Sequence, residues 1–547
     1  MLQESVIYRF VYSICAYFAD IWPESLIARI FKRIGAFFRA VFSGSSIVSF
    51  ITRDGSIGRA YDGSLLFRLL DGLLNLPQRL LHPLYKKAEI VFQESFLFKW
   101  LLFLLDRLHL LTAAFLFAAL IVPHQYFYNV YSTVAMVALL VLFFMRTVVE
   151  GRTGFHTGAF NVFLVFFIFC VILAEVFSIM PHESLRFLAF YLTCFLLVLL
   201  LIGTIRTKRD MSEALTVALI GMSIAGVYGV YQKIIGVPVN PAWVDTTVNQ
   251  GDLTRVWSFY YNPNNFAEII LLFLPFYFAA AFNAPGVLKK LFYLALAVPP
   301  FLSLILTQAR SAWIAFVLAG FVYVFLKEKR LIPLFLLLGA AAVPFLPQSI
   351  LHRIATITNA ADSSAQTRLQ VWQTVLPILK DYWVTGLGLG NETLLRVSKN
   401  YFIFVKKGAI PSHSHNLYLQ VWIETGFPGI LAFLAFLLTL IKKSLKALYQ
   451  KAQNIYTGNI LIAGLAALAG ILVMGMVEYV WFYQRVMLFF WAVVGIMLAA
   501  LNLGEEDAAQ VMDRDGCGSD SGRKGNGTDK AGWKDAEESE VEQEVAV

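Results

Sequence analysis

The sequence predicts an all-α, polytopic membrane protein, and three observations support this fold class. Hydrophobic residues make up 58% of the 547 residues and charged residues 15%, whereas soluble domains carry about 25% charged residues. Apolar stretches long enough to cross a bilayer recur between residues 110 and 503. Basic residues gather between those stretches, where they set membrane topology. The net charge of +8 therefore does not indicate nucleic-acid binding, and no DNA-binding motif accompanies it.

The first 95 residues contain no clean apolar span. The stretch Leu26–Phe42 interleaves apolar residues with arginines and lysines at helical spacing, which predicts amphipathic helices on the cytoplasmic face of the membrane. A small soluble helical domain is the alternative. Because Glu4 and Arg9 interrupt the N-terminal apolar residues and no small-residue cleavage site follows, we expect no cleavable signal peptide.

Residues 96–503 form the predicted membrane domain, and residues 504–547 follow it as a tail. The tail is rich in Gly, Asp, Glu, Lys and Ser, which predicts a disordered cytoplasmic segment. About twelve apolar stretches of the membrane domain are candidate transmembrane helices. They occupy residues 110–123, 129–147, 159–178, 184–203, 212–235, 264–284, 288–308, 310–326, 330–348, 415–441, 458–477 and 484–503.

The distribution of lysine and arginine predicts the topology. With a cytoplasmic N-terminus, the first five even-numbered stretches end at basic clusters that then face the cytoplasm, as the positive-inside rule requires. These clusters are Arg146 and Arg152; Arg206, Lys208 and Arg209; Lys289 and Lys290; Lys327, Lys329 and Arg330; and Lys442, Lys443 and Lys446.

The same topology places three loops on the outer face: residues 236–263, the short connection at Arg310, and residues 348–414 before the tenth helix. The last loop is far longer than the roughly four to six residues typical of connections, so we expect it to be structured. Within it, Arg368–Trp383 carries apolar residues at helical spacing, which predicts an amphipathic helix along the outer interface.

The stretch Ser412–Gly429 reads S-H-S-H-N-L-Y-L-Q-V-W-I-E-T-G-F-P-G. If Ser412 or Ser414 caps the following helix, His415 lies in its first turn, where the macrodipole favours anions and keeps a base neutral. On a regular helix Glu424 points away from His415 and lies about 13 Å deeper, and the final G-F-P-G loosens the helix. The alternative is two histidines in a polar loop beside an ordinary kinked helix.

Three arginines share the predicted outer face: Arg255, Arg310 and Arg368. An arginine near hydrocarbon is costly unless it is paired or functional, and the guanidinium group suits bidentate recognition of phosphate. The three side chains therefore indicate a ligand with two negative charges at the membrane surface. The alternative is that each reaches to lipid headgroups or binds a loop carbonyl.

Residues His415–Gly429 resemble the signature of the O-antigen ligase and O-antigen polymerase superfamily, a histidine followed at fixed spacing by Glu-x-Gly-x-x-Gly. Earlier segments match in order: R-V-W-S-F-Y-Y-N-P-N at Arg255–Asn264, L-T-Q-A-R-S-A-W at Leu306–Trp313, and R-L-Q-V-W with a later T-G-L-G-L-G-N at Arg368–Asn391. The resemblance covers about residues 97–503 and excludes the N-terminal region and the tail.

The resemblance implies a GT-C-like glycosyltransferase in the cytoplasmic (inner) membrane, with an extracytoplasmic site, a polyprenyl-diphosphate-linked glycan as donor, and neither cofactor nor metal. It implies His415 as the base or as the group that orients the acceptor, and Arg310 and Arg368 as diphosphate binders, with Arg255 as a third arginine. Asn416 and Glu424 belong to the same signature and are implied to bind substrate. The acceptor can be a glycan, a lipid or a protein, so ligase and polymerase both remain open. A flippase or transporter of lipid-linked glycans is the alternative from another class.

The sequence offers no metal site. The four cysteines (Cys15, Cys170, Cys194 and Cys517) show no C-x-x-C spacing, and two of them lie inside apolar stretches. The D-x-D pattern of Asp513–Asp515 falls in the predicted cytoplasmic tail. Arginines are therefore the expected source of positive charge for a leaving diphosphate.

Three further features have secondary interpretations. Gly386, Gly388 and Gly390 lack the βαβ context of a nucleotide site and are expected to form a turn. His413 is out of register with the signature. Glu478 follows the eleventh apolar stretch, where it can assist the base or pair with Arg485.

Overall fold

The computed structural model describes residues 63–151, 161–238, 254–345, 363–401, 410–449 and 454–517, together with Leu351 and eight isolated positions between residues 13 and 61. Helices are the regular elements of these residues, and no strand occurs among them. The predicted all-α class is confirmed.

A helix occupies each of the twelve predicted apolar stretches. These helices are α8 (Leu108–Ile121), α9 (Asn129–Glu150), α10 (Val162–Val176), α11 (Pro181–Thr204), α12 (Lys208–Ile235), α13 (Pro263–Asn283), α14 (Gly286–Leu306), α15 (Arg310–Glu328), α16 (Ile332–Ala342), α20 (Leu417–Tyr449), α21 (Ile455–Met474) and α22 (Gln484–Cys517).

Not all twelve helices are separate full-length spans. In the described part of the chain, nine helical segments are long and apolar enough to cross a membrane, or ten if α7 (Phe96–Asp106) and α8, bent by 66°, count as one. Helix α10 has 15 residues and is shorter. Helices α15 and α16 share one apolar segment, Arg310–Ala341, and are joined by the 3-10 turn η4 (Lys329–Leu331). The protein is therefore a multi-pass membrane protein, and its described residues contain nine to ten helical segments that are both long enough and apolar enough to cross a bilayer.

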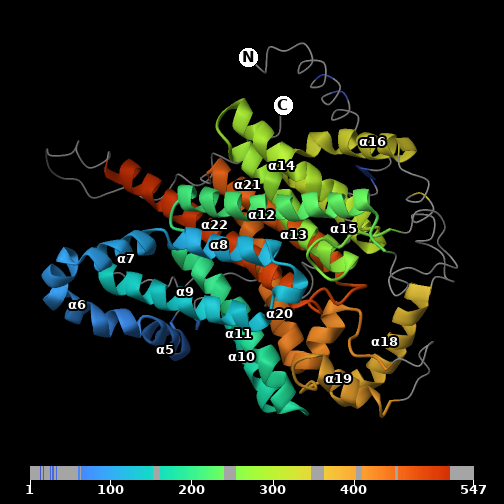
Figure 1. Ribbon diagram of the computed structural model, residues 1–547, viewed down its shortest axis with the longest axis horizontal. Helices are drawn as coiled ribbons and strands as arrows, with labels where there is room; N and C mark the ends of the chain where they lie inside the picture. The colour runs from blue at the N-terminus through green and yellow to red at the C-terminus, as the bar shows by residue number, and fades with distance from the viewer. Residues whose placement is uncertain are drawn as a thin grey trace, which may run out of the picture. The chain divides into compact units, whose positions relative to one another are not determined.

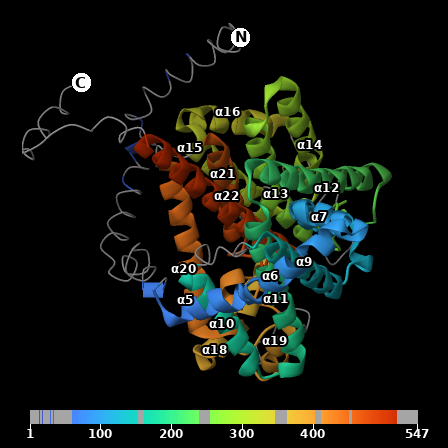
Figure 2. The same cartoon turned by 90° about the vertical axis from the view of Figure 1, so that its left-hand side faces the viewer.

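The centre of the membrane domain is built from α13, α21 and the first part of α22, which run between the other helices (Figures 1 and 2). Helix α22 is the most enclosed of the membrane helices, because 94% of the residues in its most apolar 18-residue segment are buried. Small residues let α21 approach its neighbours closely: a Cβ at Gly464 would lie 2.4 Å from Met497, and one at Gly470 would lie 3.2 Å from Ala319. The packing fixes the ends of these helices, and the candidate site lies at those ends.

Helices α5 (Leu65–Leu74), α6 (Leu76–Glu94) and α7 precede the first span and expose many leucines. Helix α6 is tied to the C-terminal end of α9, because His82 Nδ1 lies 2.7 Å from the Val148 carbonyl and Gln78 donates to the Gly151 carbonyl at 3.1 Å. The position of these helices at the membrane surface stays a prediction. The stretch Leu26–Phe42 lies almost entirely outside the described residues.

The described part of the loop before α20 is structured, as the length of the loop predicted. It contains α18 (Ser363–Asp381) and α19 (Asn391–Ser398), which lie near the N-terminal part of α20 (Figures 1 and 2). Val375, Leu394 and Ile423 belong to one buried cluster that joins the three helices. The amphipathic helix predicted at Arg368–Trp383 is therefore confirmed as a helix.

The glycine run of this loop forms the expected turn. Gly386, Gly388 and Gly390 all have positive φ, of 70°, 100° and 94°. The turn pairs with the kink of α20, where the Leu387 N–H donates to the Ile423 carbonyl at 2.7 Å. A Cβ at Gly386 would lie 2.7 Å from the Glu424 carbonyl oxygen, so the turn needs glycine for space as well as for conformation.

The predicted start of the disordered tail is wrong. Helix α22 continues to Cys517, because the residues after Leu503 include several good helix formers in E-E-D-A-A-Q-V-M. Residues 518–547 lie outside the described residues.

Candidate functional site

The loop between α21 and α22 is the meeting point of the segments singled out in the sequence. The Leu417 N–H donates to the Gly475 carbonyl at 2.7 Å. The Asn416 amide donates to the Met476 carbonyl at 2.7 Å, and Arg368 Nε donates to the Val477 carbonyl at 2.7 Å. Hydrogen bonds to three consecutive carbonyls thus hold the His415 segment and α18 against the loop between α21 and α22.

Glu478, the next residue of this loop, is the centre of a charged network. Its carboxylate is paired with Arg368, accepts from the Asn264 amide at 3.3 Å, and lies 3.5 Å from His415 Nδ1. Burial alone would raise the pKa of Glu478, but the charge of Arg368, together with the nearby His415, outweighs burial and holds the pKa at about 2. Glu478 is therefore a buried carboxylate that stays ionised.

Arg255 joins the same network through Asn264. Its guanidinium donates to the Asn264 side-chain oxygen at 2.7 Å and to the Thr307 carbonyl at 2.8 Å. Asn264 is positioned by the start of α13, where the Asn262 side chain caps the helix and Pro263 occupies the first turn. The motif R-V-W-S-F-Y-Y-N-P-N thus supplies both an arginine and the amide that links it to Glu478.

Arg310 is the first residue of α15 and is partly exposed. It lies three residues after Thr307, whose carbonyl accepts from Arg255. The connecting residue Gln308 has φ of 51° and donates to the Thr254 carbonyl at 3.4 Å. The segments that carry Arg255 and Arg310 are therefore adjacent.

The predicted position of His415 in the first turn of a helix is wrong. Helix α20 begins at Leu417, and the cap is Asn416, whose side-chain oxygen accepts from the Leu419 N–H at 2.9 Å. Ser414 is used elsewhere, because its N–H donates to Gln420 Oε1 at 2.8 Å and its hydroxyl donates to the Asn416 carbonyl at 2.8 Å. His415 lies outside the helix with φ of 50°, and its environment is set by Glu478 rather than by the helix end.

The His415 ring is held between a carboxylate and a second imidazole. Its Nδ1 atom is buried and lacks a partner that meets hydrogen-bond geometry, while 27% of the side chain remains exposed. The ring centroid lies 4.1 Å from that of His413, which in turn lies 4.3 Å from that of Phe482. Burial, followed by the neighbouring His415, lowers the pKa of His413 to about 3, so His413 is a neutral packing partner.

Backbone strain is concentrated in these segments. The non-glycine residues with positive φ in the described part of the chain are Ser258, Tyr261, Gln308 and His415. All four lie in the loops that carry Arg255, precede Arg310 or hold the histidine. Residues in this region of φ cost free energy and cluster at functional sites, where the surrounding structure enforces them.

Glu424 lies near this network but faces the protein interior. It is 1% exposed, and its carboxylate accepts from Gln420 at 3.0 Å, from Tyr191 at 3.1 Å and from Tyr479 at 3.2 Å. Because Gln420 also binds the Ser414 N–H, Glu424 braces the segment that carries His415. Glu424 has no direct contact with His415 among these bonds, as the sequence predicted.

Arg485 does not pair with Glu478. Its guanidinium donates to the Val122 carbonyl at 2.7 Å, next to the C-terminal end of α8, and lies 3.8 Å from the centroid of the Phe127 ring. The pairing of Glu478 with Arg485 is therefore wrong. The partner of Glu478 is Arg368, 110 residues away, which no local spacing could indicate.

Metal-ligand clusters are absent from the described ranges, in that no three of the His, Cys, Asp and Glu residues there could share a metal ion. The positive charge of the site comes from arginine. The fold and site thus define a multi-pass α-helical membrane protein with a histidine, a carboxylate and arginines assembled at one end of its central helices.

Residues 294–434 match the family model described as O-antigen ligase. A segment of 183 residues is 25% identical to a protein of Rickettsia typhi provisionally named a polysaccharide ligase, covering 32% of this chain and 43% of that one. A segment of the same length is 24% identical to a protein of Rickettsia felis with the same provisional name and the same coverage. The aligned part therefore spans less than half of each relative. Over residues 294–434 the chain is thus similar to the O-antigen ligase family.

Proposed function

We propose that this chain is a glycosyltransferase that moves a glycan from a polyprenyl-diphosphate carrier to an acceptor hydroxyl at the outer face of the cytoplasmic membrane. The network that joins His415, Glu478 and Arg368 carries the proposal, because it combines a base, its orienting carboxylate and a phosphate-binding group. The O-antigen ligase match supports ligase-type glycan transfer and includes His415, Arg310 and Arg368 within its bounds.

His415 is the base. In the proposed mechanism the Nδ1–H of His415 donates to the Glu478 carboxylate. This tautomer leaves the Nε2 lone pair for the acceptor hydroxyl. The hydroxyl oxygen bonds to the anomeric carbon, the bond from that carbon to the diphosphate oxygen breaks, and the hydroxyl proton passes to His415. The Nδ1 to carboxylate distance of 3.5 Å is long for a hydrogen bond, and such bonds often shorten when substrate binds.

The arginines stabilise the leaving diphosphate. Arg368 is paired with Glu478 and is 20% exposed in its side chain, so its guanidinium charge lies at the surface of the network, where a phosphate can approach it. Arg310 is partly exposed, and Arg255 is held by Asn264 beside it. A bound diphosphate competes with Glu478 for the Arg368 guanidinium. The Glu478 carboxylate then interacts more strongly with the protonated His415.

The position of the site argues against the transporter alternative. Transporters place their binding groups near the midplane on broken helices, whereas this network occupies the start of α13, the start of α20 and the loop after α21. Ligase and polymerase differ in the acceptor, a lipid core, protein or wall polymer against a second lipid-linked glycan, and both fit the proposed chemistry.

The direct test is transfer by the purified protein from a lipid-linked oligosaccharide to candidate acceptors. We expect transfer by the wild type and loss of about a hundredfold to ten-thousandfold in His415→Ala, the usual contribution of a positioned base. His413→Ala is the matched control, since it removes the neighbouring imidazole and should retain most activity. Donor binding should persist in both variants. Near-wild-type turnover in His415→Ala would remove the proposed base, and movement of substrate without a new glycosidic bond would favour the transporter.

A further inference from the structure

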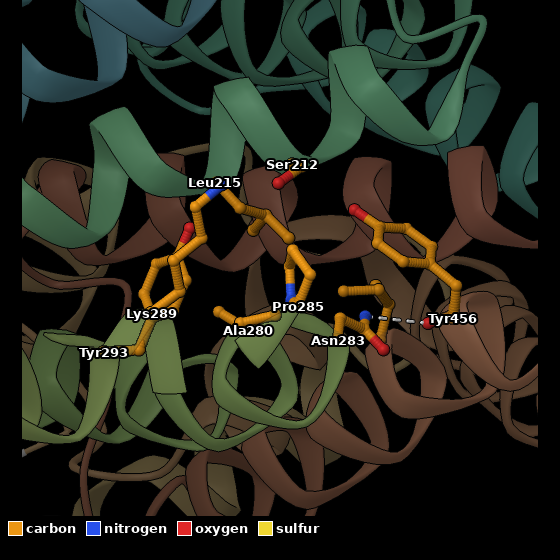
Figure 3. A pocket seen from close by; sticks show the side chains of 10 residues that line it. Ser212, Leu215, Ala280, Asn283, Pro285, Lys289, Tyr293 and Tyr456 are labelled. Atoms are coloured by element: carbon orange, nitrogen blue, oxygen red, sulfur yellow. Dashed lines mark hydrogen bonds between the residues drawn. The ribbon is translucent and has the colours of Figure 1, made fainter. Parts of the chain in front are cut away.

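A small polar pocket lies between α12, α13, α14 and α21. It has a volume of about 90 Å³, and side chains from all four helices surround one opening (Figure 3). Its polar lining residues are Ser212, Asn283, Lys289, Tyr293 and Tyr456. None of them belongs to the candidate transfer site.

Helix α13 relates the pocket to the transfer site, because it carries Asn264 near its start and Asn283 at its end. Nineteen residues of α-helix rise about 28 Å, which is close to the roughly 30 Å thickness of the hydrocarbon core. The pocket therefore lies at the level of the opposite headgroup layer, which the topology prediction assigns to the cytoplasmic leaflet.

Basic residues concentrate at this end of the domain. Lys208 and Arg209 begin α12, and Lys289 and Lys290 lie in the first turns of α14. Lys327, near the end of α15, donates to the side-chain oxygen of Asn459 at 2.5 Å. The end of the domain that carries the pocket is therefore positively charged.

The pocket wall is held by hydrogen bonds between the helices. Asn283 donates to the Tyr456 carbonyl at 3.1 Å and accepts from Asn459 at 2.7 Å, and the hydroxyls of Thr216 and Tyr293 lie 2.7 Å apart. The side chains of Ser212, Tyr456 and Lys289 border the opening (Figure 3). Because the Thr216 hydroxyl donates to the Ser212 carbonyl, the Tyr293 hydroxyl donates to Thr216 and is already used. The polar groups that can face a ligand are the Lys289 ammonium and the hydroxyls of Ser212 and Tyr456, and such groups suit a tetrahedral oxyanion.

The apolar surface beside the pocket suits lipid chains. Val287 and Leu288, which precede Lys289 in α14, are 60% and 83% exposed, and Leu291 one turn further is 56% exposed. At the level of the headgroup layer Val287 and Leu288 lie in the interface, and Leu291 lies one turn closer to the hydrocarbon. A ligand with a phosphate head and two acyl chains would therefore contact polar and apolar surface at once.

We propose that this pocket binds the phosphate headgroup of an anionic glycerophospholipid from the cytoplasmic leaflet. A volume of about 90 Å³ leaves room for a phosphate group. Basic pockets between transmembrane helices on the cytoplasmic side recognise anionic headgroups by the same combination of charge and donors. This lipid site is independent of the proposed glycan transfer.

The proposal is tested by native mass spectrometry of the detergent-purified full chain with phosphatidylglycerol, and by its thermal midpoint in the same samples. We expect phosphatidylglycerol to remain bound and to raise the midpoint, and Lys289→Gln to weaken binding about tenfold. Lys290→Gln is the matched control, because it removes a neighbouring exposed charge that does not line the pocket. Ser212→Ala provides a second, milder change in the pocket wall and should weaken binding severalfold.

Three results would overturn the assignment. Equal retention of phosphatidylglycerol by wild type and Lys289→Gln would exclude the pocket as the site. Equal retention of phosphatidylcholine would indicate unselective lipid contact. A midpoint shift produced fully by inorganic phosphate, with no added effect of phosphatidylglycerol, would assign the pocket to free phosphate.

Discussion

Replacement of Glu478 by glutamine should slow transfer while leaving donor binding nearly unchanged. The substitution keeps the size of the side chain and removes its charge, which the network places 3.5 Å from His415 Nδ1. At an effective dielectric constant near 20, two unit charges at that separation interact by about 4–5 kcal/mol. Arg368 shares the carboxylate and solvent reaches His415, so we take roughly half of this Coulomb energy, about 2 kcal/mol, as the lost stabilisation of the His415 imidazolium. A loss of that size corresponds to about a thirtyfold fall in kcat.

The assay is steady-state transfer from a lipid-linked donor, with kcat and KM measured separately. Glu392→Gln, an exposed glutamate at the start of α19, is the matched control and should behave as wild type. A Glu478→Asp variant should recover part of the lost rate, because it restores the negative charge at a greater distance from His415 Nδ1. The reasoning is refuted if Glu478→Gln keeps the wild-type kcat, or if it changes KM alone.

The remaining predictions concern charge, metal, topology and pH. Arg368→Lys and Arg310→Lys should each impair donor binding and turnover, since lysine keeps the charge but loses the bidentate fork; unchanged affinity and rate would exclude these roles. Chelators should leave transfer unaffected, and activity restored by Mg²⁺ after chelation would contradict an arginine-based site. Accessibility labels at Lys208 should report the cytoplasm and labels at Glu392 the outside, and the reverse would invert the topology. Because the folded pKa of Glu478 is lowered from 4.5 to about 2, its stabilisation is present above pH about 4.5 and is lost as the pH falls towards 2; acid unfolding that is as steep in Glu478→Gln as in wild type would contradict this.

The helices themselves could be predicted because they depend on local sequence. Long apolar stretches must satisfy their own backbone in a bilayer, and only helices do so within one segment. The kink of α20 was also predictable from its G-F-P-G sequence. In the structure Gly426 of that sequence adopts φ of 70° and ψ of −179°. Whether α10 and α16 cross a membrane was not decided by hydropathy alone, because their lengths of 15 and 11 residues emerge only in the structure.

The candidate site was predicted in part. The histidine and the arginine segments could be chosen from residue types and from their shared side of the predicted topology. The helix cap could not be predicted reliably, because Ser414 and Asn416 are both good caps and the choice depends on Gln420 taking the Ser414 N–H and on the Met476 carbonyl taking the Asn416 amide.

Sequence alone determined that this protein is a helical membrane protein and which residues are candidates for its chemistry, because apolar length and residue type are local properties. Only the tertiary structure decided that Glu478 is the common partner of His415, Arg368 and Asn264. These groups come from α18, α13, the segment before α20 and the loop after α21, and their contacts exist only when α13 and α21 pack side by side. A hydrogen-bond network among distant segments is a consequence of helix packing, and packing leaves no periodic signal in the sequence around any one of its members.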